Sequence, residues 1–258
     1  MTGGNTRTGA VWITGAGSGI GRALALRYLR AGAIVAGTAR RLETLASLPA
    51  EARGAGGRFH AFAADLTDLA ATRAVIARIE AELGPIRLAV LNAGTHKPTP
   101  GTRFQADDVR MLLDSNVMTV ANSLDAVLPG FLARNSGMVA INASLAGYGG
   151  LPSAAGYGAS KAALINMAEA LKLDLDGKGI IVRLISPGFV RTPLTDRNPF
   201  PMPFLMDVDV AAERLWQALE TGGDFEITFP RRFAYILKTL RLLPYSLYFP
   251  LVRRFTGI

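Results

Sequence analysis

Cysteine is absent from this 258-residue chain, and histidine occurs only as His60 and His96. Disulfides and thiolate metal sites are therefore excluded, and there are too few imidazoles for a histidine-rich metal site, so no metal is expected. The first ten residues are polar and glycine-rich, without the apolar segment of a signal peptide. We therefore expect a cytoplasmic location by default.

Acidic residues are missing from the C-terminal end. Residues 231–258 contain six basic residues and no acid: Arg231, Arg232, Lys238, Arg241, Arg253 and Arg254. Subtracting these six from the 28 basic residues leaves 22 against 20 acidic residues, a net charge of +2 out of the chain's +8. A nearly neutral body argues against a nucleic-acid partner and makes the basic end a separate question.

Short apolar runs alternate with helical patterns along most of the chain. Strands are predicted at residues 10–14, 34–38, 58–63, 86–91, 138–142, 180–185 and 225–229, and helices at 23–29, 69–82, 106–133, 157–176 and 210–219. This alternation predicts one parallel, doubly wound α/β sheet with helices on both faces. Apolar residues make up 50% of the chain, enough for a large core.

A glycine-rich turn follows the first predicted strand, with Gly15, Gly19 and Gly21 around Ser18 and Ile20. Glycines let a backbone approach a pyrophosphate, and the N-terminus of the next helix offers free N–H groups. The spacing differs from the common G-x-G-x-x-G. A nucleotide site is favoured over a simple turn because the glycines lie between a strand and a helix.

Arginine follows the second predicted strand. A site for NAD(H), which lacks the 2′-phosphate of NADP(H), usually has an acidic residue at this place. The sequence there is Ala39-Arg40-Arg41, with Arg40 19 residues past Gly21. An arginine can pair with a 2′-phosphate, which favours NADP(H) over NAD(H). The alternative is a solvated arginine at the start of the next helix.

Tyr157 and Lys161 lie four residues apart, so a helix places both on one face. A nearby ammonium is expected to lower the pKa of the phenol toward working pH, which suits proton transfer during carbonyl reduction or alcohol oxidation. Ser144 precedes Tyr157 by 13 residues. The pair alone also occurs on solvated helix faces, but together with Ser144 and the glycine turn it indicates a catalytic site.

Other candidates lie where strands end. Asp65 follows the third strand, Asn92-Ala93-Gly94 follows the fourth, and Asp68 is expected to cap the next helix. His96 is expected to be an exposed loop residue, with a place in a substrate pocket as the alternative. Asn116 falls inside the long helix 106–133, where burial of a satisfied amide is the simplest reason for it.

These motifs resemble the short-chain dehydrogenase/reductase family. The residues that carry the resemblance are Thr14-Gly15-x-x-x-Gly19-x-Gly21, Asn92-Ala93-Gly94, Asn116, Ser144, Tyr157-x-x-x-Lys161, Pro187-Gly188 and Thr192. The resemblance implies a Rossmann fold with a seven-stranded, mainly parallel sheet of order 3-2-1-4-5-6-7, and a nicotinamide cofactor. It covers roughly residues 8–195.

The resemblance also implies roles for the residues that match. Tyr157 would be the acid/base, Ser144 would hydrogen-bond the substrate oxygen, Lys161 would hold the nicotinamide ribose and lower the Tyr157 pKa, and Asn116 would anchor a relay water. Asp65 and Leu66 would contact the adenine of the cofactor, and Val190 and Thr192 would contact the carboxamide of its nicotinamide. The whole expected cofactor-binding set is Gly15, Ser18, Gly19, Ile20, Gly21, Arg40, Asp65, Leu66, Asn92, Ala93, Gly94, Tyr157, Lys161, Pro187, Gly188, Val190 and Thr192.

The expected function is an NADP(H)-dependent oxidoreductase that interconverts a carbonyl and a secondary alcohol. Alternatives are an epimerase or dehydratase of the same family, or a nucleotide-binding redox sensor without turnover. Residues 192–208, which include Phe200-Pro201-Met202-Pro203-Phe204, are expected to form a lid over an apolar substrate.

The C-terminus departs from the family pattern. Residues 1–230 are expected to form one catalytic domain, followed by a basic, apolar extension at 231–258. The extension argues against the usual tetramer and favours a homodimer. Its uncharged run from Leu242 to Val252 has 11 residues, too few for the 20 or so of a membrane span. The extension is expected either to lie on a membrane surface or to pack on the body or a second subunit.

Overall fold

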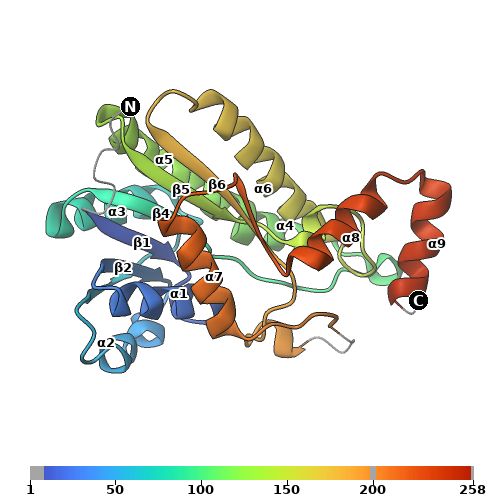
Figure 1. The fold of residues 1–258 in the computed structure, drawn as a ribbon, viewed down its shortest axis with the longest axis horizontal. Coiled ribbons are helices and arrows are strands. Elements are labelled where there is room, and N and C mark those ends of the chain that lie inside the picture. Colours follow the sequence, from blue (N-terminus) through green and yellow to red (C-terminus); the bar gives the residue numbers. More distant parts are fainter. Residues whose placement is uncertain (1–8, 198–201, 257–258) are drawn as a thin grey trace.

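A seven-stranded parallel sheet forms the centre of the computed structural model, which describes residues 9–197 and 202–256 (Figure 1). Within these residues the strand order is β3-β2-β1-β4-β5-β6-β7, and every neighbouring pair is parallel, which confirms the predicted fold class. The strands are β1 Ala10–Thr14, β2 Ile34–Ala39, β3 Arg58–Ala63, β4 Ile86–Leu91, β5 Gly137–Asn142, β6 Ile180–Pro187 and β7 Glu226–Phe229.

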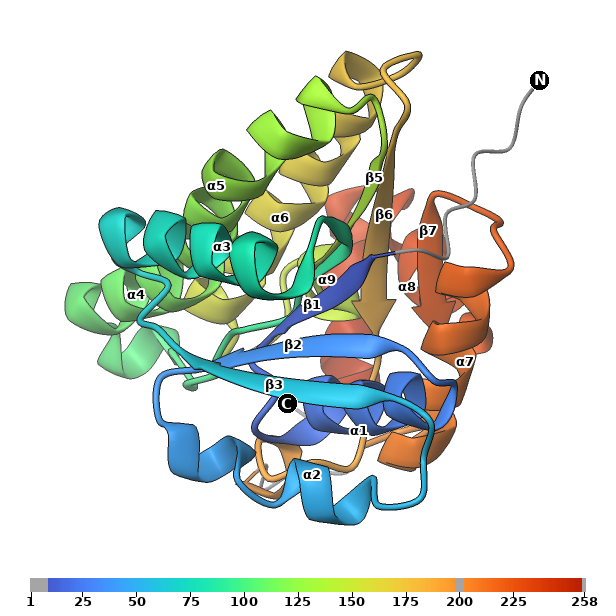
Figure 2. The same ribbon diagram turned by 90° about the vertical axis from the view of Figure 1, so that its left-hand side faces the viewer.

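Helices cover both faces of the sheet, as Figure 2 shows. On one face lie α3 Leu69–Leu83, α4 Ala106–Leu113, α5 Thr119–Ala133 and α6 Ala155–Asp174, and on the other lie α1 Gly19–Arg30, the short α2 Leu48–Glu51 and α7 Val208–Glu220. Asp68 caps α3 as predicted, since its carboxylate accepts the Ala71 N–H (3.1 Å). The chain ends in two further helices, α8 Arg231–Arg241 and α9 Tyr245–Thr256.

Strand β1 shows how the sequence builds a core on each face. Side chains alternate along a strand, so Val11 and Ile13 pack with α1 and α7, while Trp12 packs on the opposite face with α3 and α5. All three side chains are fully buried. The Trp12 indole N–H donates to Thr38 Oγ1 (2.9 Å), which satisfies its polar group inside the core.

The helical segment predicted at 106–133 is not one regular helix. A π-helical turn, Asp114–Met118, separates α4 from α5. Such a turn adds a residue to the helix and turns one side chain out of register. Here that turn contains Asn116, which is fully buried.

The two C-terminal helices extend from the sheet edge, at the right of Figure 1. Helix α8 follows β7 directly, and Lys238 forms an ion pair with Glu226 of that strand. The Tyr248 hydroxyl of α9 donates to the Gly150 carbonyl (2.8 Å), in the loop between Ser144 and Tyr157. None of the helices in the described ranges is long and apolar enough to cross a membrane.

Candidate active site

The glycine turn between β1 and α1 brings two backbone segments closer than any side chain would allow. A Cβ on Gly21 would lie 2.5 Å from the Gly15 carbonyl oxygen and 2.4 Å from Asn92 Nδ2. Gly15 and Gly19 also have positive φ angles of 66° and 54°, which disfavour other residues. Ser18 precedes α1 without a side-chain cap, and Ser18, Gly19 and Ile20 line the cleft, so the N-terminus of this helix can receive an anionic group.

Asparagine and threonine side chains connect the carboxyl ends of β1, β4 and β5. Thr14 Oγ1 accepts the backbone N–H groups of Asn92 and Ala93, both at 2.9 Å. Asn142 Nδ2 donates to Asn92 Oδ1 (2.8 Å), and Lys161 Nζ donates to the Asn142 carbonyl (2.8 Å). This network fixes the lysine relative to the glycine turn.

Asn116 ties the π-helical turn to the loop after β4 and to α6. Its Oδ1 accepts the Thr95 N–H (2.7 Å), and its Nδ2 donates to the Thr95 carbonyl (3.0 Å) and to Ser160 Oγ (2.9 Å). A Cβ placed on Gly94 would lie 2.9 Å from Asn116 Oδ1 and 3.7 Å from Lys161 Nζ. The amide is thus buried and satisfied, and it lies near the lysine.

Helix α6 holds Tyr157 and Lys161 one turn apart, with Ser144 opposite them. The Ser144 hydroxyl is a hydrogen-bond partner of the Tyr157 phenol. Lys161 Nζ lies 5.8 Å from the centroid of the tyrosine ring and is almost fully buried. The three side chains therefore meet on one wall of the cleft.

The pKa of Tyr157 shifts opposite to the expectation. Burial raises the pKa of the phenol, and the hydrogen bond from Ser144 lowers it by less. Burial also lowers the pKa of Lys161 from 10.5 to about 8. Desolvation is the larger of the two effects on Tyr157, so its pKa lies above the ordinary value of a phenol.

His96 is not the exposed loop residue that the sequence suggested. Its ring packs edge-on against the Tyr157 ring, with 4.8 Å between centroids and 87° between planes. Burial lowers the pKa of His96, so the imidazole is neutral at physiological pH. The neighbouring Thr95 is held by Asn116, which fixes the loop that carries the imidazole.

Removal of the His96 ring is expected to weaken catalysis without abolishing it. An edge-to-face contact contributes about 0.5–1.5 kcal/mol, so His96→Ala is expected to lower kcat/KM by roughly 2- to 10-fold, and His96→Phe to restore most of it. Because the lowered pKa leaves His96 neutral at physiological pH, the pH profile is expected to stay unchanged at and above neutral pH. His60→Ala, on β3, is the control. Equal kcat/KM for wild type and His96→Ala would show that the contact does not position Tyr157.

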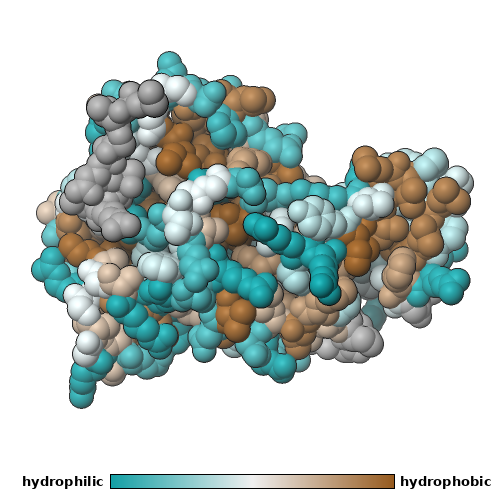
Figure 3. Space-filling view, in the orientation of Figure 1, coloured by the Kyte–Doolittle hydropathy of each residue, from teal (hydrophilic) through white to brown (hydrophobic). Residues whose placement is uncertain are grey.

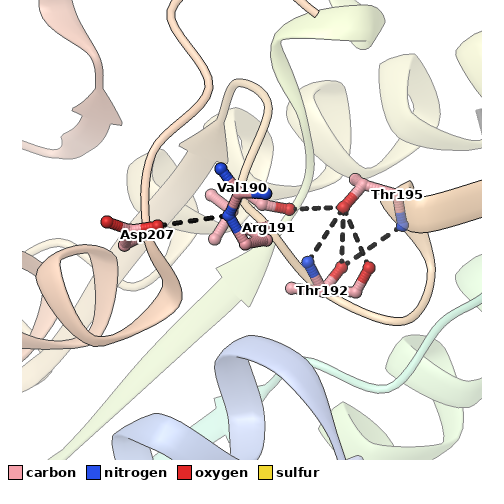
Figure 4. A network of polar contacts seen from close by, with 5 residues as sticks. All are labelled: Val190, Arg191, Thr192, Thr195 and Asp207. Carbon is pink, nitrogen blue, oxygen red and sulfur yellow. Dashed lines mark hydrogen bonds and ion pairs between the residues drawn. The ribbon is translucent and has the colours of Figure 1, made fainter.

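The loop after β6 forms the opposite wall of the cleft. Figure 4 shows how Thr195 holds it: its hydroxyl donates to the Val190 carbonyl (2.7 Å) and accepts the Thr192 N–H (2.9 Å). Arg191 pairs with Asp207 at the start of α7 (3.3 Å). A Cβ on Gly19 would touch the Thr192 methyl at 3.3 Å, so this loop and the glycine turn approach each other closely.

Most of the expected site residues line one continuous cleft. A cavity of about 450 Å³ is lined by Gly15, Ser18, Gly19, Ile20, Arg40, Asn92, Ala93, Gly94, Ser144, Tyr157, Lys161, Pro187, Gly188, Val190 and Thr192. A neighbouring hollow of about 330 Å³ shares Arg40 with it and adds Asp65 and Leu66. Gly21 and Asn116 lie behind the lining, and residues 198–201 of the expected lid lie outside the described residues.

Comparison with known proteins decides the family. The family model described as short chain dehydrogenase matches residues 9–199. The chain belongs to the short-chain dehydrogenase/reductase family. It is therefore an NAD(P)-dependent oxidoreductase of the kind that acts on CH–OH groups. The glycine turn with its close backbone contacts and the long cleft fit a dinucleotide.

Relatives of this short-chain dehydrogenase/reductase cover most of its length. An uncharacterized oxidoreductase of Myxococcus xanthus is 40% identical over 242 residues, 94% of this chain and 95% of that protein. A 3-oxoacyl-[acyl-carrier-protein] reductase of Thermotoga maritima is 32% identical over 72% of this chain and 76% of its own. A short-chain dehydrogenase from Sphingobium yanoikuyae, solved in complex with NADPH, has a TM-score of 0.78 and 26% identity, and the match covers 97% of this chain and 94% of that one.

Several residues of the site were missed by sequence reasoning. Arg41 lines the cleft beside Arg40, and so do Asn142, Thr95 and Thr195, which form hydrogen bonds with Lys161, Asn116 and Val190, respectively. Arg41 was visible as part of an arginine pair. The contacts of Asn142 and Thr95 join segments 19 and 21 residues apart, which leave no local signal, whereas Thr195 acts within its own loop, on residues three and five positions before it.

Proposed function

We propose that this protein is an NADP(H)-dependent oxidoreductase that interconverts a carbonyl and a secondary alcohol, with Tyr157 as the acid/base. The observation that carries the proposal is one cleft that joins Ser144, Tyr157 and Lys161 to the glycine turn and to Arg40. A bound nicotinamide supplies or accepts the hydride there. Everything else in the reaction is positioning and proton transfer by the chain.

Tyr157 and Ser144 act on the substrate oxygen in this proposal. Because burial raises its pKa, the phenol is protonated at neutral pH and is ready to donate a proton as a carbonyl is reduced. The Ser144 hydroxyl, which already contacts the phenol, orients the same oxygen. Lys161 holds the ribose and supplies positive charge as negative charge develops on Tyr157. Its anchor on the Asn142 carbonyl sets its position.

Arg40 is proposed to select the phosphorylated cofactor. Both Arg40 and Arg41 are exposed at the cleft, after Ala39 at the end of β2. The hollow between them and Gly17 contains one carboxylate, Asp65, whose pKa is lowered chiefly by hydrogen bonds from Thr67. Two guanidinium groups, with only one carboxylate in the same hollow and that carboxylate already hydrogen-bonded to Thr67, favour a phosphate ligand.

Replacement of Arg40 is expected to change cofactor preference. Arg40→Leu should weaken the binding of NADPH by roughly 10- to 150-fold, which corresponds to the 1.5–3 kcal/mol of a hydrogen bond to a charged group. The binding of NADH should weaken much less. Dissociation constants for both cofactors, measured by fluorescence titration, test this. Arg53→Leu, exposed and outside the cleft, is the control. A wild type that binds NADH as tightly as NADPH would refute the proposed preference.

An apolar substrate suits the wall beside the proposed nicotinamide site. Phe233 of α8 stacks on Phe189 (5.9 Å between centroids) and contacts Phe204 (5.8 Å). The Phe233 ring also stands against Gly188, where an added Cβ would lie 3.2 Å from it. Pro193 and Leu194 line the cleft nearby. We propose residues 1–230 as the catalytic domain, with α8 supporting its substrate wall, in a cytoplasmic homodimer.

A panel of aliphatic and steroid-like ketones, followed at 340 nm with NADPH, tests the proposed activity. We expect oxidation of NADPH with at least one apolar ketone and slower reaction with charged analogues. NADPH binding without turnover on any carbonyl would favour the alternative of a redox-sensing nucleotide-binding protein. Conversion of a nucleotide sugar without net change at 340 nm would favour an epimerase.

A further inference from the structure

The α8–α9 hairpin, residues 231–256, exposes many apolar side chains to solvent. Leu242 and Phe255 are 84% and 71% exposed, and Tyr235, Leu247 and Phe249 are more than half exposed. Figure 3 shows hydrophobic residues gathered over this projecting end of the molecule. Scattered apolar residues are ordinary on a surface, but a cluster on a projecting element indicates an interaction site.

The inner side of the hairpin is already used for packing. Leu240, Tyr248 and Val252 are buried together, with Leu151 from the body against them. The Lys238–Glu226 ion pair and the Tyr248–Gly150 hydrogen bond fasten both helices to the body. The exposed apolar residues are therefore a second surface on a hairpin that is already held in place.

The same two helices carry five exposed arginines and Lys238. Lys238 is paired with Glu226, and Arg241 contacts the Tyr245 hydroxyl (3.2 Å). No ion pair joins Arg231, Arg232, Arg253 or Arg254 to a carboxylate in the described part of the chain. Four arginines with unpaired charge, on the same helices as exposed aromatic and aliphatic side chains, match an anionic, partly apolar surface.

A second copy of the chain is a poor occupant of this surface. In a two-fold symmetric dimer the same patch faces itself, so arginines without nearby acids would be brought together. The body offers no compensating excess of negative charge, since residues 1–230 have a net charge of +2. We propose that the α8–α9 hairpin binds in-plane to the surface of an anionic phospholipid membrane.

The lengths of the helices fit contact with a membrane surface. Helix α8 has 11 residues and α9 has 12, which correspond to lengths of roughly 17–18 Å, against about 30 Å for the apolar core of a bilayer. Short amphipathic helices with arginines and aromatic residues are typical of in-plane binding. The exposed rings of Phe249 and Tyr245, stacked at 5.4 Å, would enter the headgroup boundary.

Vesicle flotation with the full-length protein tests the proposal. We expect the wild type to float with vesicles that contain about 30% phosphatidylserine, but not with vesicles of phosphatidylcholine alone. About 0.5 M salt should abolish flotation, because it screens the attraction. The assay needs no substrate or turnover, so its result is independent of the proposed enzymatic function.

Two paired variants assign the binding to this surface. Arg253→Gln with Arg254→Gln is expected to lower vesicle binding by roughly 10- to 30-fold. Arg30→Gln with Arg53→Gln removes the same charge from exposed positions at the end of α1 and after α2, outside the hairpin, and should float as the wild type does. Leu242→Gln with Leu247→Gln is also expected to weaken binding, and Leu173→Gln, 79% exposed on α6, is its control.

The proposal is overturned if the wild type stays unbound to anionic vesicles at low salt. It is also overturned if the Arg253/Arg254 variant floats as well as the Arg30/Arg53 control. If the wild type does not float, and the Leu242/Leu247 variant has a smaller mass by analytical ultracentrifugation, the surface is a contact between copies. Circular dichroism of each variant establishes that it is folded before the comparison.

Discussion

Tyr157→Phe is expected to lower kcat by about 10²- to 10⁴-fold, the range for a lost general acid. The substitution keeps the ring that packs against His96 and removes only the hydroxyl that meets Ser144. Since the phenylalanine ring fills the same space, NADPH binding should change little. The loss should therefore lie in kcat and not in the affinity for cofactor.

Single-turnover rates and NADPH titrations, measured on the same preparation, separate these two effects. Tyr235→Phe removes a hydroxyl from an exposed tyrosine on α8 and should leave kcat unchanged. If Tyr157→Phe retained turnover within a factor of two or three of wild type, Tyr157 would not be the acid/base, and Ser144 or a water would have to supply the proton.

The fold class and the spacing of the main site residues could be predicted from the sequence, because both depend on patterns within short segments of the chain. Alternating strands and helices predict a parallel sheet, and strands of a parallel sheet end at one edge, so residues after β1, β4 and β5 must meet there. The four-residue spacing of Tyr157 and Lys161 likewise follows from helix geometry. The strand order was predicted from the family resemblance, because the periodicity of apolar residues predicts strands and helices but not the order of the strands in the sheet.

The rest of the site depends on contacts between segments distant in sequence. His96 meets Tyr157 from a loop that Asn116, in a π-helical turn, holds at Thr95. The register change that buries Asn116 has no signature in the apolar pattern of 106–133. The sign of the Tyr157 pKa shift was wrong for the same reason: the sequence shows that a lysine is near, but not that both groups are desolvated.

Lys161→Met is expected to abolish most turnover while making the cofactor-free protein more stable. Lys161 is almost fully buried, and no carboxylate is paired with it in the described residues. Its pKa of about 8 in the folded state, against 10.5, corresponds to a cost of about 3 kcal/mol for holding the charge at neutral pH. The hydrogen bond to Asn142 offsets part of that cost.

A methionine of similar length removes the buried charge and retains the apolar contacts of the stem. We expect a net gain of about 1–2 kcal/mol in the free energy of unfolding at pH 7 and a rise in Tm of roughly 2–6 °C. Turnover should fall by roughly 10²-fold or more, because the charge proposed to assist Tyr157 and to hold the ribose is gone.

The pH dependence of this stability difference identifies its cause. Below pH 8, Lys161 is charged in both the folded and unfolded states, so the wild type bears the full cost of burial. Between pH 8 and 10.5 the unfolded state binds more protons than the folded state, so the wild type gains stability as the pH rises. The advantage of Lys161→Met should therefore be largest below pH 8 and should shrink toward pH 10.5. Thermal melts across this range test it, with Lys178→Met, exposed in the turn that follows the same helix, as the control. A variant less stable than wild type at pH 7, or a difference that does not change with pH, would mean that the hydrogen bond to Asn142 outweighs the burial of the charge.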